Sequence, residues 1–468
     1  MPDSNSQSQR ARNLRFSSLD AIMATPWSLL SLPGSFLAAG FLNTLFNVGP
    51  VWFGLITAMP ALANALQIFL VPVTARFLHV RDLTLSMGWL NAGLWLSGIV
   101  GMAFLPLDTP DQSGLFFTIL FLLASVSMSM MALGWMTWVT DFVPVRIRGR
   151  YFGRRNRLAN ISTLGFILTS LALLGISGAS RGSYLALCGL AVFLRVASMM
   201  VQHLIISPTP GGGSLGSANW ARDITGLRRN RQLVRFILFG ALTGFWLGSL
   251  GTIGPLYALG PLGVSPAMFT GLALVSTVTG AMFIRIWGEL IDRHGAAPVV
   301  VICMTSWRLI DYAWIFLTPS TTHFMYLMWA LGGIMGAGYL VASFNLLLKL
   351  VPQDRRAAGI SLNLTATSVA AALAPILVGF IIYTTTRMGS EIIHTYRVLF
   401  GVANTGGLLT VLILWRLPEP QTAPDRNTIN GAMRTLRFLT VNQGLSFLSN
   451  ATFVVRQRKG DNGSNPSK

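Results

Sequence analysis

The sequence contains few charged residues, very few carboxylates and almost no cysteine. Charged residues make up 10% of its 468 positions, and only 15 residues are Asp or Glu. Hydrophobic residues make up 52%, and the mean hydropathy is +0.59. A single water-soluble core cannot bury so much apolar surface, so a soluble globular domain is excluded. The composition indicates an integral membrane protein.

Residues that carry catalytic or metal chemistry are also scarce. The two cysteines, Cys188 and Cys303, both lie inside apolar runs, which argues against a disulfide framework or a thiolate metal site. The five histidines are scattered, and the sequence contains no nucleophilic triad, phosphate-binding glycine loop or pair of catalytic carboxylates. We therefore expect neither enzyme activity nor a metal or other cofactor.

Basic residues outnumber acidic ones, which gives a net charge of +19. In a soluble protein this excess would suggest nucleic acid, but here most arginines fall in short gaps between apolar runs, a pattern that sets membrane orientation. Alternate gaps on one side hold nearly all of them, and the other side has only Arg181, Arg387 and Arg397. We predict a multi-pass protein of the cell membrane with both termini in the cytoplasm and no nucleic-acid partner.

Twelve apolar runs are long enough for spanning helices, which need roughly 20 residues each. They cover about 21–46, 50–72, 84–105, 114–140, 159–178, 184–206, 233–257, 266–289, 298–318, 324–349, 358–384 and 394–415. A stretch rich in Pro, Gly and Ser follows the sixth run and reads as a linker. The predicted organisation is a cytoplasmic segment 1–20, a six-helix bundle 21–206, a linker 207–232, a second six-helix bundle 233–416 and a cytoplasmic tail 417–468. Within that tail, 431–455 reads either as an amphipathic segment on the membrane surface or as disorder.

An arginine-rich turn occurs twice. Asp141 to Arg157 and Lys349 to Gly359 each follow an apolar run, and each has a proline with an arginine four residues later. A duplicated turn indicates two similar halves, the usual plan of a secondary transporter. Superposing the prolines places Asp141 opposite Lys349, which predicts a cytoplasmic gate formed by Asp141, Arg148, Lys349 and Arg356.

The loop after the eighth run resembles a motif of the major facilitator superfamily. The sequence GELIDRHG places Gly288, Leu290, Asp292, Arg293 and Gly295 in the spacing of that motif, although the same residues could form a plain turn. The resemblance implies an all-α membrane fold of twelve transmembrane helices in two pseudo-symmetric six-helix bundles. The sequence departs from the family between its second and third runs, where 73–82 lacks both glycines. Its fifth run contains no proline, which makes multidrug export less favoured.

The resemblance also implies that helices 1, 4, 7 and 10 line a central route. The substrate-cavity candidates on these helices are Trp135, Thr137, Trp138, Trp246, Tyr339 and Asn345. Aromatic rings with a few polar groups suit an amphipathic pocket. Ordinary helix packing is the competing explanation for each tryptophan, and interfacial anchoring is a further one for Trp329.

One ion pair is predicted within an apolar run. Asp311 lies near the middle of the ninth run, and Arg308 is three residues before it on the same helix face. The pair could couple transport to a proton or another ion. We favour a structural role, because helix 9 braces the outside of the bundle in the superfamily.

These features together predict a secondary transporter that moves a small solute by alternating access, in contact with the bilayer and as a monomer. The alternative is a receptor or scaffold without transport activity, built on the same fold. A cavity reachable from one face at a time favours transport, whereas a packed centre favours the scaffold. A membrane-embedded transferase is a third possibility, and the lack of an acidic cluster in any loop argues against it.

Overall fold

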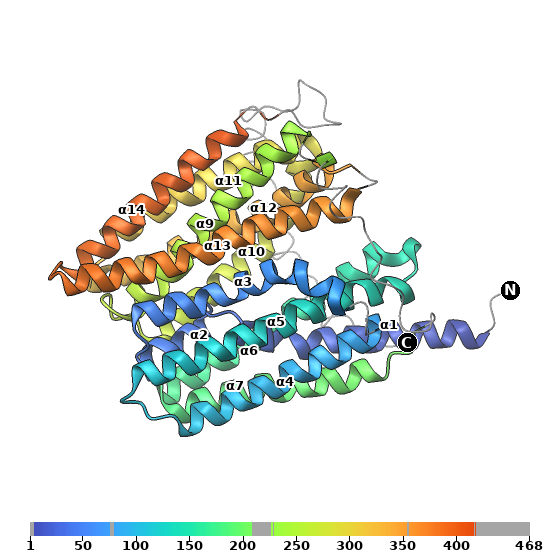
Figure 1. The fold of residues 1–468 in the computed structure, drawn as a ribbon, viewed down its shortest axis with the longest axis horizontal. Coiled ribbons are helices and arrows are strands. Elements are labelled where there is room, and N and C mark those ends of the chain that lie inside the picture. Colours follow the sequence, from blue (N-terminus) through green and yellow to red (C-terminus); the bar gives the residue numbers. More distant parts are fainter. Residues whose placement is uncertain are drawn as a thin grey trace, which may run out of the picture.

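The computed structural model describes residues 4–74, 79–207, 226–227, 229–352, 355–415 and 417, and every regular element in those residues is helical (Figure 1). Ten helical segments in this part of the chain are long and apolar enough to cross a membrane. The predicted all-α membrane class is confirmed. The predicted amphipathic segment 431–455 and most of the linker 207–232 lie outside the described residues.

The elements fall into two runs along the chain. The first run contains α1 (Ser4–Leu30), α2 (Phe36–Gly40), the π-helix η1 (Phe41–Leu45), α3 (Pro50–Thr74), α4 (Val80–Phe104), α5 (Pro110–Phe142), the short 3-10 helix η2 (Val145–Ile147), α6 (Arg148–Ser177) and α7 (Arg181–His203). The second contains α9 (Arg231–Leu259), α10 (Pro266–His294), α11 (Ala296–Asp311), the 3-10 helices η4 (Tyr312–Phe316) and η5 (Pro319–Phe324), α12 (Met325–Leu350), α13 (Arg356–Arg387), α14 (Ile392–Val411) and η7 (Leu412–Leu414). We call them the N half and the C half.

Several helices begin where the sequence supplies a cap. Pro266 is the first residue of α10, and the Ser265 side chain accepts a hydrogen bond from the backbone N–H of Met268. Asn230 caps α9 in the same way. A polar side chain before the helix accepts a hydrogen bond from a free N–H group of the first turn, and proline at the first position has no N–H that would need a partner.

The first predicted span differs from the observed structure. Instead of one helix over 21–46, α1 begins at Ser4 and ends at Leu30, and a shorter apolar helix of α2 and η1 follows over Phe36–Leu45. The interruption contains Pro33 and Gly34, and the Ser35 side chain caps α2. The early start was missed because the first two turns and more are polar, with three arginines. The buried residues of this polar segment begin at Asn13, and α1 packs on α6 and α7.

The two halves repeat one packing arrangement. In the N half α1 packs on α6 and α7, and α5 packs on α3 and α4; in the C half α9 packs on α13 and α14, and α12 packs on α10 and α11. Between the halves, α3 packs on α13 and α6 packs on α10. Each of these contacts in one half has its counterpart in the other, as the duplicated turn predicted.

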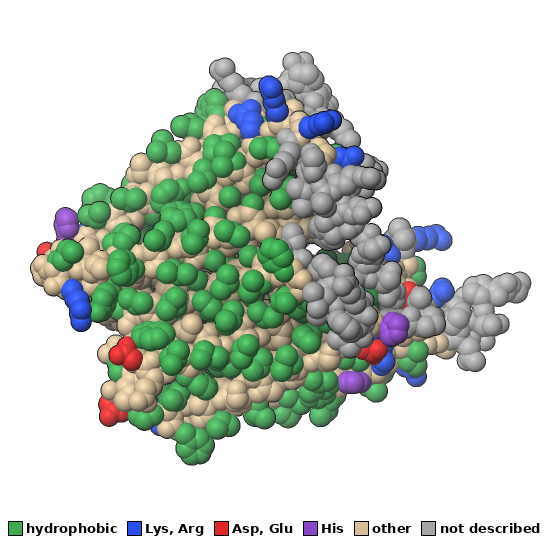
Figure 2. Space-filling view, viewed as in Figure 1, with side chains coloured by type: hydrophobic (Ala, Val, Ile, Leu, Met, Phe, Trp, Pro, Cys, Tyr) green, Lys and Arg blue, Asp and Glu red, His purple; other side chains and the backbone are tan. Residues whose placement is uncertain are grey.

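The outer surface suits a lipid environment. Figure 2 shows apolar side chains over the middle of the visible face and charged side chains toward its two ends. Exposed apolar residues on the helices include Leu90, Leu96, Val100, Leu168, Ile176, Leu377 and Phe380. A surface of this kind is stable when lipid covers it.

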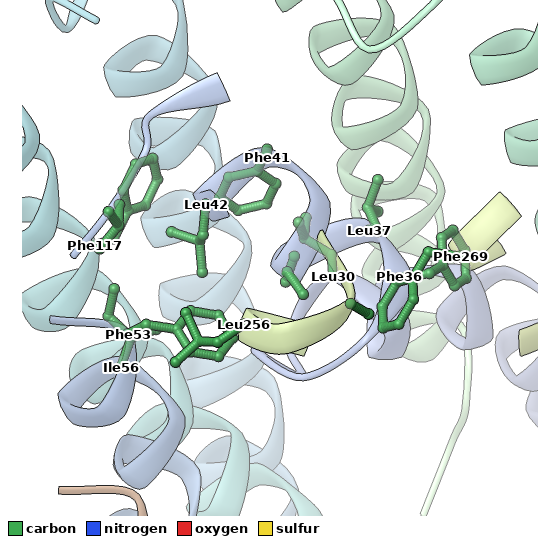
Figure 3. Close-up of a cluster of buried hydrophobic side chains, with 14 of the residues drawn as sticks. Leu30, Phe36, Leu37, Phe41, Leu42, Phe53, Ile56, Phe117, Leu256 and Phe269 are labelled. Carbon is green, nitrogen blue, oxygen red and sulfur yellow. The ribbon is translucent and has the colours of Figure 1, made fainter. Parts of the chain in front are cut away.

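Among the residues that the structure describes, the two halves share an apolar cluster at one end of the molecule and have separate clusters at the other. We call the end where α1 begins and α5, α7 and α12 finish the basic end, and the opposite end the far end. At the far end one apolar cluster includes residues of both halves, and Figure 3 shows Leu256 and Phe269 of the C half among Phe36, Leu42 and Phe53 of the N half. At the basic end each half has its own cluster. The halves are thus joined at the far end and packed separately at the basic end.

Candidate functional site

Two adjoining cavities lie inside the molecule. The central cavity has a volume of about 490 Å³ and is lined by both halves, including Thr57 of α3, Ile167 of α6 and Thr277 of α10. The second, which we call the C-half cavity, has a volume of about 430 Å³ and is lined by α9, α10, α11, α12 and α14. Both fall within the size range of small-molecule sites, roughly 300–1,000 Å³.

The two cavities meet at the break in the first crossing. Gly34, Leu247, Gly251 and Trp329 line both of them. A β-carbon at Gly34 would lie 3.3 Å from the carbonyl oxygen of Gly251, so the backbones of the break and of α9 approach closely there. A solute in the central cavity would therefore have the C-half cavity next to it.

The predicted ion pair is formed and lies in the wall of the C-half cavity. An Nη atom of Arg308 is 3.0 Å from a carboxylate oxygen of Asp311, and the exposed fractions of the two side chains are 1% and 15%. Arg308 also donates to Asn404 of α14 at 3.4 Å and lies over the ring of Trp307. The pair thus joins α11 to α14 and presents its carboxylate to a cavity, an arrangement compatible with both roles considered from the sequence.

Asp311 is the only carboxylate among the residues that line these two cavities. The remaining walls are largely aromatic and glycine-rich, with Trp307, Trp314, Trp329 and Phe269 around the C-half cavity. An apolar pocket with one buried charged pair can bind a molecule that has an apolar body and a small polar group.

The structure places two of the predicted cavity residues inside the halves. Trp138 is fully buried, donates to Ser207 at 2.5 Å and contacts Phe142 edge-on. Trp246 donates to Thr410 of α14 at 3.1 Å. Neither residue lines the central or the C-half cavity, so both agree better with the packing explanation.

The other four candidates also lie outside the walls of these cavities. Trp135 is half-buried beneath the guanidinium of Arg155, 4.3 Å from ring to charge. Tyr339 lies beside Trp307, and the side chains of Thr137 and Asn345 each donate to a carbonyl of their own helix. Their contact with a solute remains a prediction. The aromatic residue that does line both cavities is Trp329, whose ring meets Phe269 edge-on at 5.4 Å.

The predicted gate residues lie at the basic end. Asp141 is in the last turn of α5, Lys349 is in the last turn of α12, and both side chains are half-buried. Arg148 folds back onto the end of α5, where it donates to the carbonyls of Val143 at 3.0 Å and Thr140 at 2.9 Å. Arg148, which belongs to the first arginine-rich turn, therefore caps the C-terminal end of α5. Arg356 begins α13, but its side chain is outside the described part of the chain, and the gate as a whole stays a prediction.

The loop motif forms the tight turn between α10 and α11. Gly295 has a φ of +89°, a conformation that favours glycine, and Leu290 is fully buried. Asp292 and Arg293 are exposed, and Gly288 has open space around it. Glu289, rather than Asp292, forms the ion pairs of this turn, with Arg285 at 3.3 Å and Arg293 at 4.0 Å.

A buried carboxylate at the basic end was missed from the sequence. Asp20 of α1 is 2% exposed, and its oxygens lie 3.3 Å from Arg155 of α6, 2.7 Å from Ser198 and 2.8 Å from Gln202 of α7. Arg195 of α7 interacts electrostatically with Asp20 and lies over Trp27. Asp20 therefore ties three helices of the N half together. The sequence did offer one signal for Asp20: carboxylates are rare in this chain, and Asp20 lies next to an apolar run.

Comparison with known proteins agrees with this arrangement. The model of the Major Facilitator Superfamily matches residues 236–457. Solved structures of similar fold include a mutant of the nucleoside transporter NupG (TM-score 0.67, 14% identity, 87% of this chain and 99% of that one) and a D-xylose–proton symporter (TM-score 0.66, 13% identity, 86% and 98%). A bacterial homologue of the iron transporter ferroportin, in an inward-facing state, has a TM-score of 0.65 at 13% identity, over 88% and 98% of the chains. No curated protein matches the sequence.

The fold and the site thus define a multi-pass, all-helical membrane protein of two similar halves with a cavity between them. The C half carries the sequence resemblance to the major facilitator superfamily, whose model matches residues 236–457, and the likeness of fold to solved transporters extends over most of the chain. The family resemblance of the GELIDRHG loop is confirmed by this match, which includes the loop.

Proposed function

We propose that this protein is a secondary active transporter that moves a small solute across the cell membrane by alternating access. The observation that carries the proposal is the unequal packing of the two ends around the central cavity. One apolar cluster joins the halves at the far end, whereas the clusters at the basic end are separate. A cavity reached from one side at a time requires such an asymmetry, and a rocking motion of the halves would reverse it.

The orientation follows from the basic residues. The basic end has exposed arginines that include Arg15, Arg146, Arg150, Arg154, Arg157, Arg231 and Arg293, while the far end has few. The positive-inside rule assigns the basic end to the cytoplasm. In this orientation the far end is extracellular, and the conformation described above corresponds to an inward-facing one.

The cavities favour transport over the scaffold alternative. A receptor or scaffold would keep a packed centre, whereas a hollow of about 490 Å³ is lined here by both halves. The similar structures are named as a nucleoside transporter, a homologue of an iron transporter and a D-xylose–proton symporter, and these names give starting classes for a substrate search.

The test is uptake by proteoliposomes of the full chain, with a panel of nucleosides, sugars, metal ions and amphipathic metabolites, each with and without a proton gradient. A variant that fills the cavity makes the test specific. Gly251 lines both cavities and has open space where a β-carbon would lie, so Gly251→Leu should abolish uptake while the protein still folds. The matched control is Gly93→Leu on the exposed side of α4, which should transport normally. Equal uptake by both variants would contradict the proposed route.

A further inference from the structure

A third hollow lies at the basic end between α1 and α6, outside the two cavities. We call it the α1–α6 groove; its volume is about 1130 Å³. Four arginines line it, Arg15 from α1 and Arg150, Arg154 and Arg157 from α6. All four are exposed, and no carboxylate is among the lining residues. The groove is therefore a concentrated positive site.

The helical repeat shows which surface this groove belongs to. The arginines of α6 are separated by four and three residues, so they lie on one face of the helix. The same spacing continues through Ile161 and Leu168, whose side chains are 65% and 52% exposed. Neither side chain lines the central or the C-half cavity, so this exposed apolar face is available to lipid chains. The three arginines are thus at the end of a lipid-facing stripe.

The neighbouring arginine is a useful contrast. Arg155 points away from this face, into the N half, where it pairs with Asp20 and lies over Trp135. The charge that the fold of the N half requires is therefore supplied by Arg155. The groove arginines are not needed for that contact, and apolar residues such as Leu19 and Leu158 lie between them.

We propose that the α1–α6 groove binds an anionic phospholipid, with the phosphate among the four guanidinium groups and an acyl chain along Ile161 and Leu168. Guanidinium groups bind phosphate oxygens with strong, charge-assisted hydrogen bonds. A positive site that continues directly into a lipid-facing apolar stripe fits a molecule with both a phosphate and a chain. Free phosphate would use only the first of these features. The site is separate from the solute cavity and independent of the proposed transport function.

The experiment is a lipid titration of the purified full-length protein by native mass spectrometry, with phosphatidylglycerol as the probe and phosphatidylcholine as the neutral comparison. A basic residue near an anionic membrane contributes roughly a fivefold change in affinity. The triple variant R150Q/R154Q/R157Q should therefore bind phosphatidylglycerol roughly a hundredfold more weakly, with no change for phosphatidylcholine. The matched control is Arg231→Gln, an exposed arginine of the same end in the C half, which should bind like the unaltered protein.

Other outcomes decide against the site. Undiminished phosphatidylglycerol binding by the triple variant would overturn the proposal, and so would an equal loss in Arg231→Gln. Displacement of the lipid by millimolar inorganic phosphate would show a site for soluble anions instead. If the triple variant does not fold, Arg154→Gln and Arg157→Gln are measured singly, and each must lose roughly fivefold for the proposal to stand.

Discussion

Gly54 of α3 lies against the carbonyl oxygen of Pro375 in α13, so closely that a β-carbon at Gly54 would overlap it. Gly379 of α13 lies against the carbonyl oxygen of Pro50 in the same way, one turn nearer the far end. Glycine at both positions permits the two backbones to approach, and this contact joins the halves on one side of the central cavity. The far end is therefore closed by backbone contact as well as by the shared apolar cluster.

A side chain at Gly54 should prevent this closure. We expect Gly54→Val to favour the state that is open at the far end, because valine cannot fit against Pro375 unless α3 and α13 separate. The measurement is the rate at which a membrane-impermeant thiol reagent modifies Thr57→Cys, a cavity position, in a background without native cysteines. Modification from the far side should rise severalfold. Gly93→Val, on the exposed side of α4, is the control and should leave the rate unchanged.

Variants of Arg308 and Asp311 can show whether this pair couples transport to a proton or only stabilises the packing of the helices. If Asp311 carries a transported proton, Asp311→Asn should abolish gradient-driven accumulation and leave solute exchange measurable, because exchange requires no change in protonation. If the pair is structural, the same variant should be lost from the membrane, since removal of one partner leaves a buried charge at a cost of about 3–5 kcal/mol. Recovery of folding in an Arg308→Leu, Asp311→Leu double variant would identify a packing pair.

Asp20 should stabilise the N half. Asp20→Asn removes the charge that balances Arg155 and leaves the arginine buried, which should lower stability by about 3–5 kcal/mol. Thermal unfolding in detergent measures this directly. The control is Asp108→Asn, because Asp108 is exposed in the loop between α4 and α5. If both variants unfold at the same temperature, Asp20 does not have the stabilising role assigned to it.

The predicted gate at the basic end concerns Asp141 and Lys349. If the two helix ends meet when that end closes, Asp141→Asn and Lys349→Ala should each favour the inward-facing state by about 1 kcal/mol, a severalfold shift in population. Cysteine accessibility from the basic end should then increase in both variants. If cysteine accessibility in both variants equals that of the unaltered protein, Asp141 and Lys349 do not form a gate.

Much of the fold could be predicted because each membrane crossing is encoded locally. Apolar runs of about 20 residues identify spanning helices without tertiary information, and the duplicated turns at Pro144 and Pro352 indicated two similar halves. The start of α1 at Ser4 could not be found in this way, because its first residues are polar, whereas contacts that bury Asn13, Ser17 and Asp20 come from parts of the chain far away in sequence. Local patterns do not report such contacts.

The site was less predictable for the same reason. The Arg308–Asp311 pair was predicted correctly because its residues are three positions apart on one helix. The Asp20 contacts involve partners more than 130 positions away, and no local spacing reveals them. The tryptophans show a second reason why the site could not be predicted from the sequence. Trp138 and Trp329 have the same chemistry, yet one is buried within the N half and the other faces both cavities, because helix rotation decides which side a ring faces.

Alternate opening of the two ends is tested most directly by distances between spin labels placed at both ends. One pair at the far end, Leu107→Cys and Met388→Cys, and one at the basic end, Leu204→Cys and Trp415→Cys, use exposed positions of opposite halves. Each pair is labelled in proteoliposomes after Cys188 and Cys303 are replaced by serine. We predict two populations whose proportions change with pH or bound solute, so that a longer far-end distance accompanies a shorter basic-end distance. A single, unchanging distance at both ends under all conditions would contradict the account.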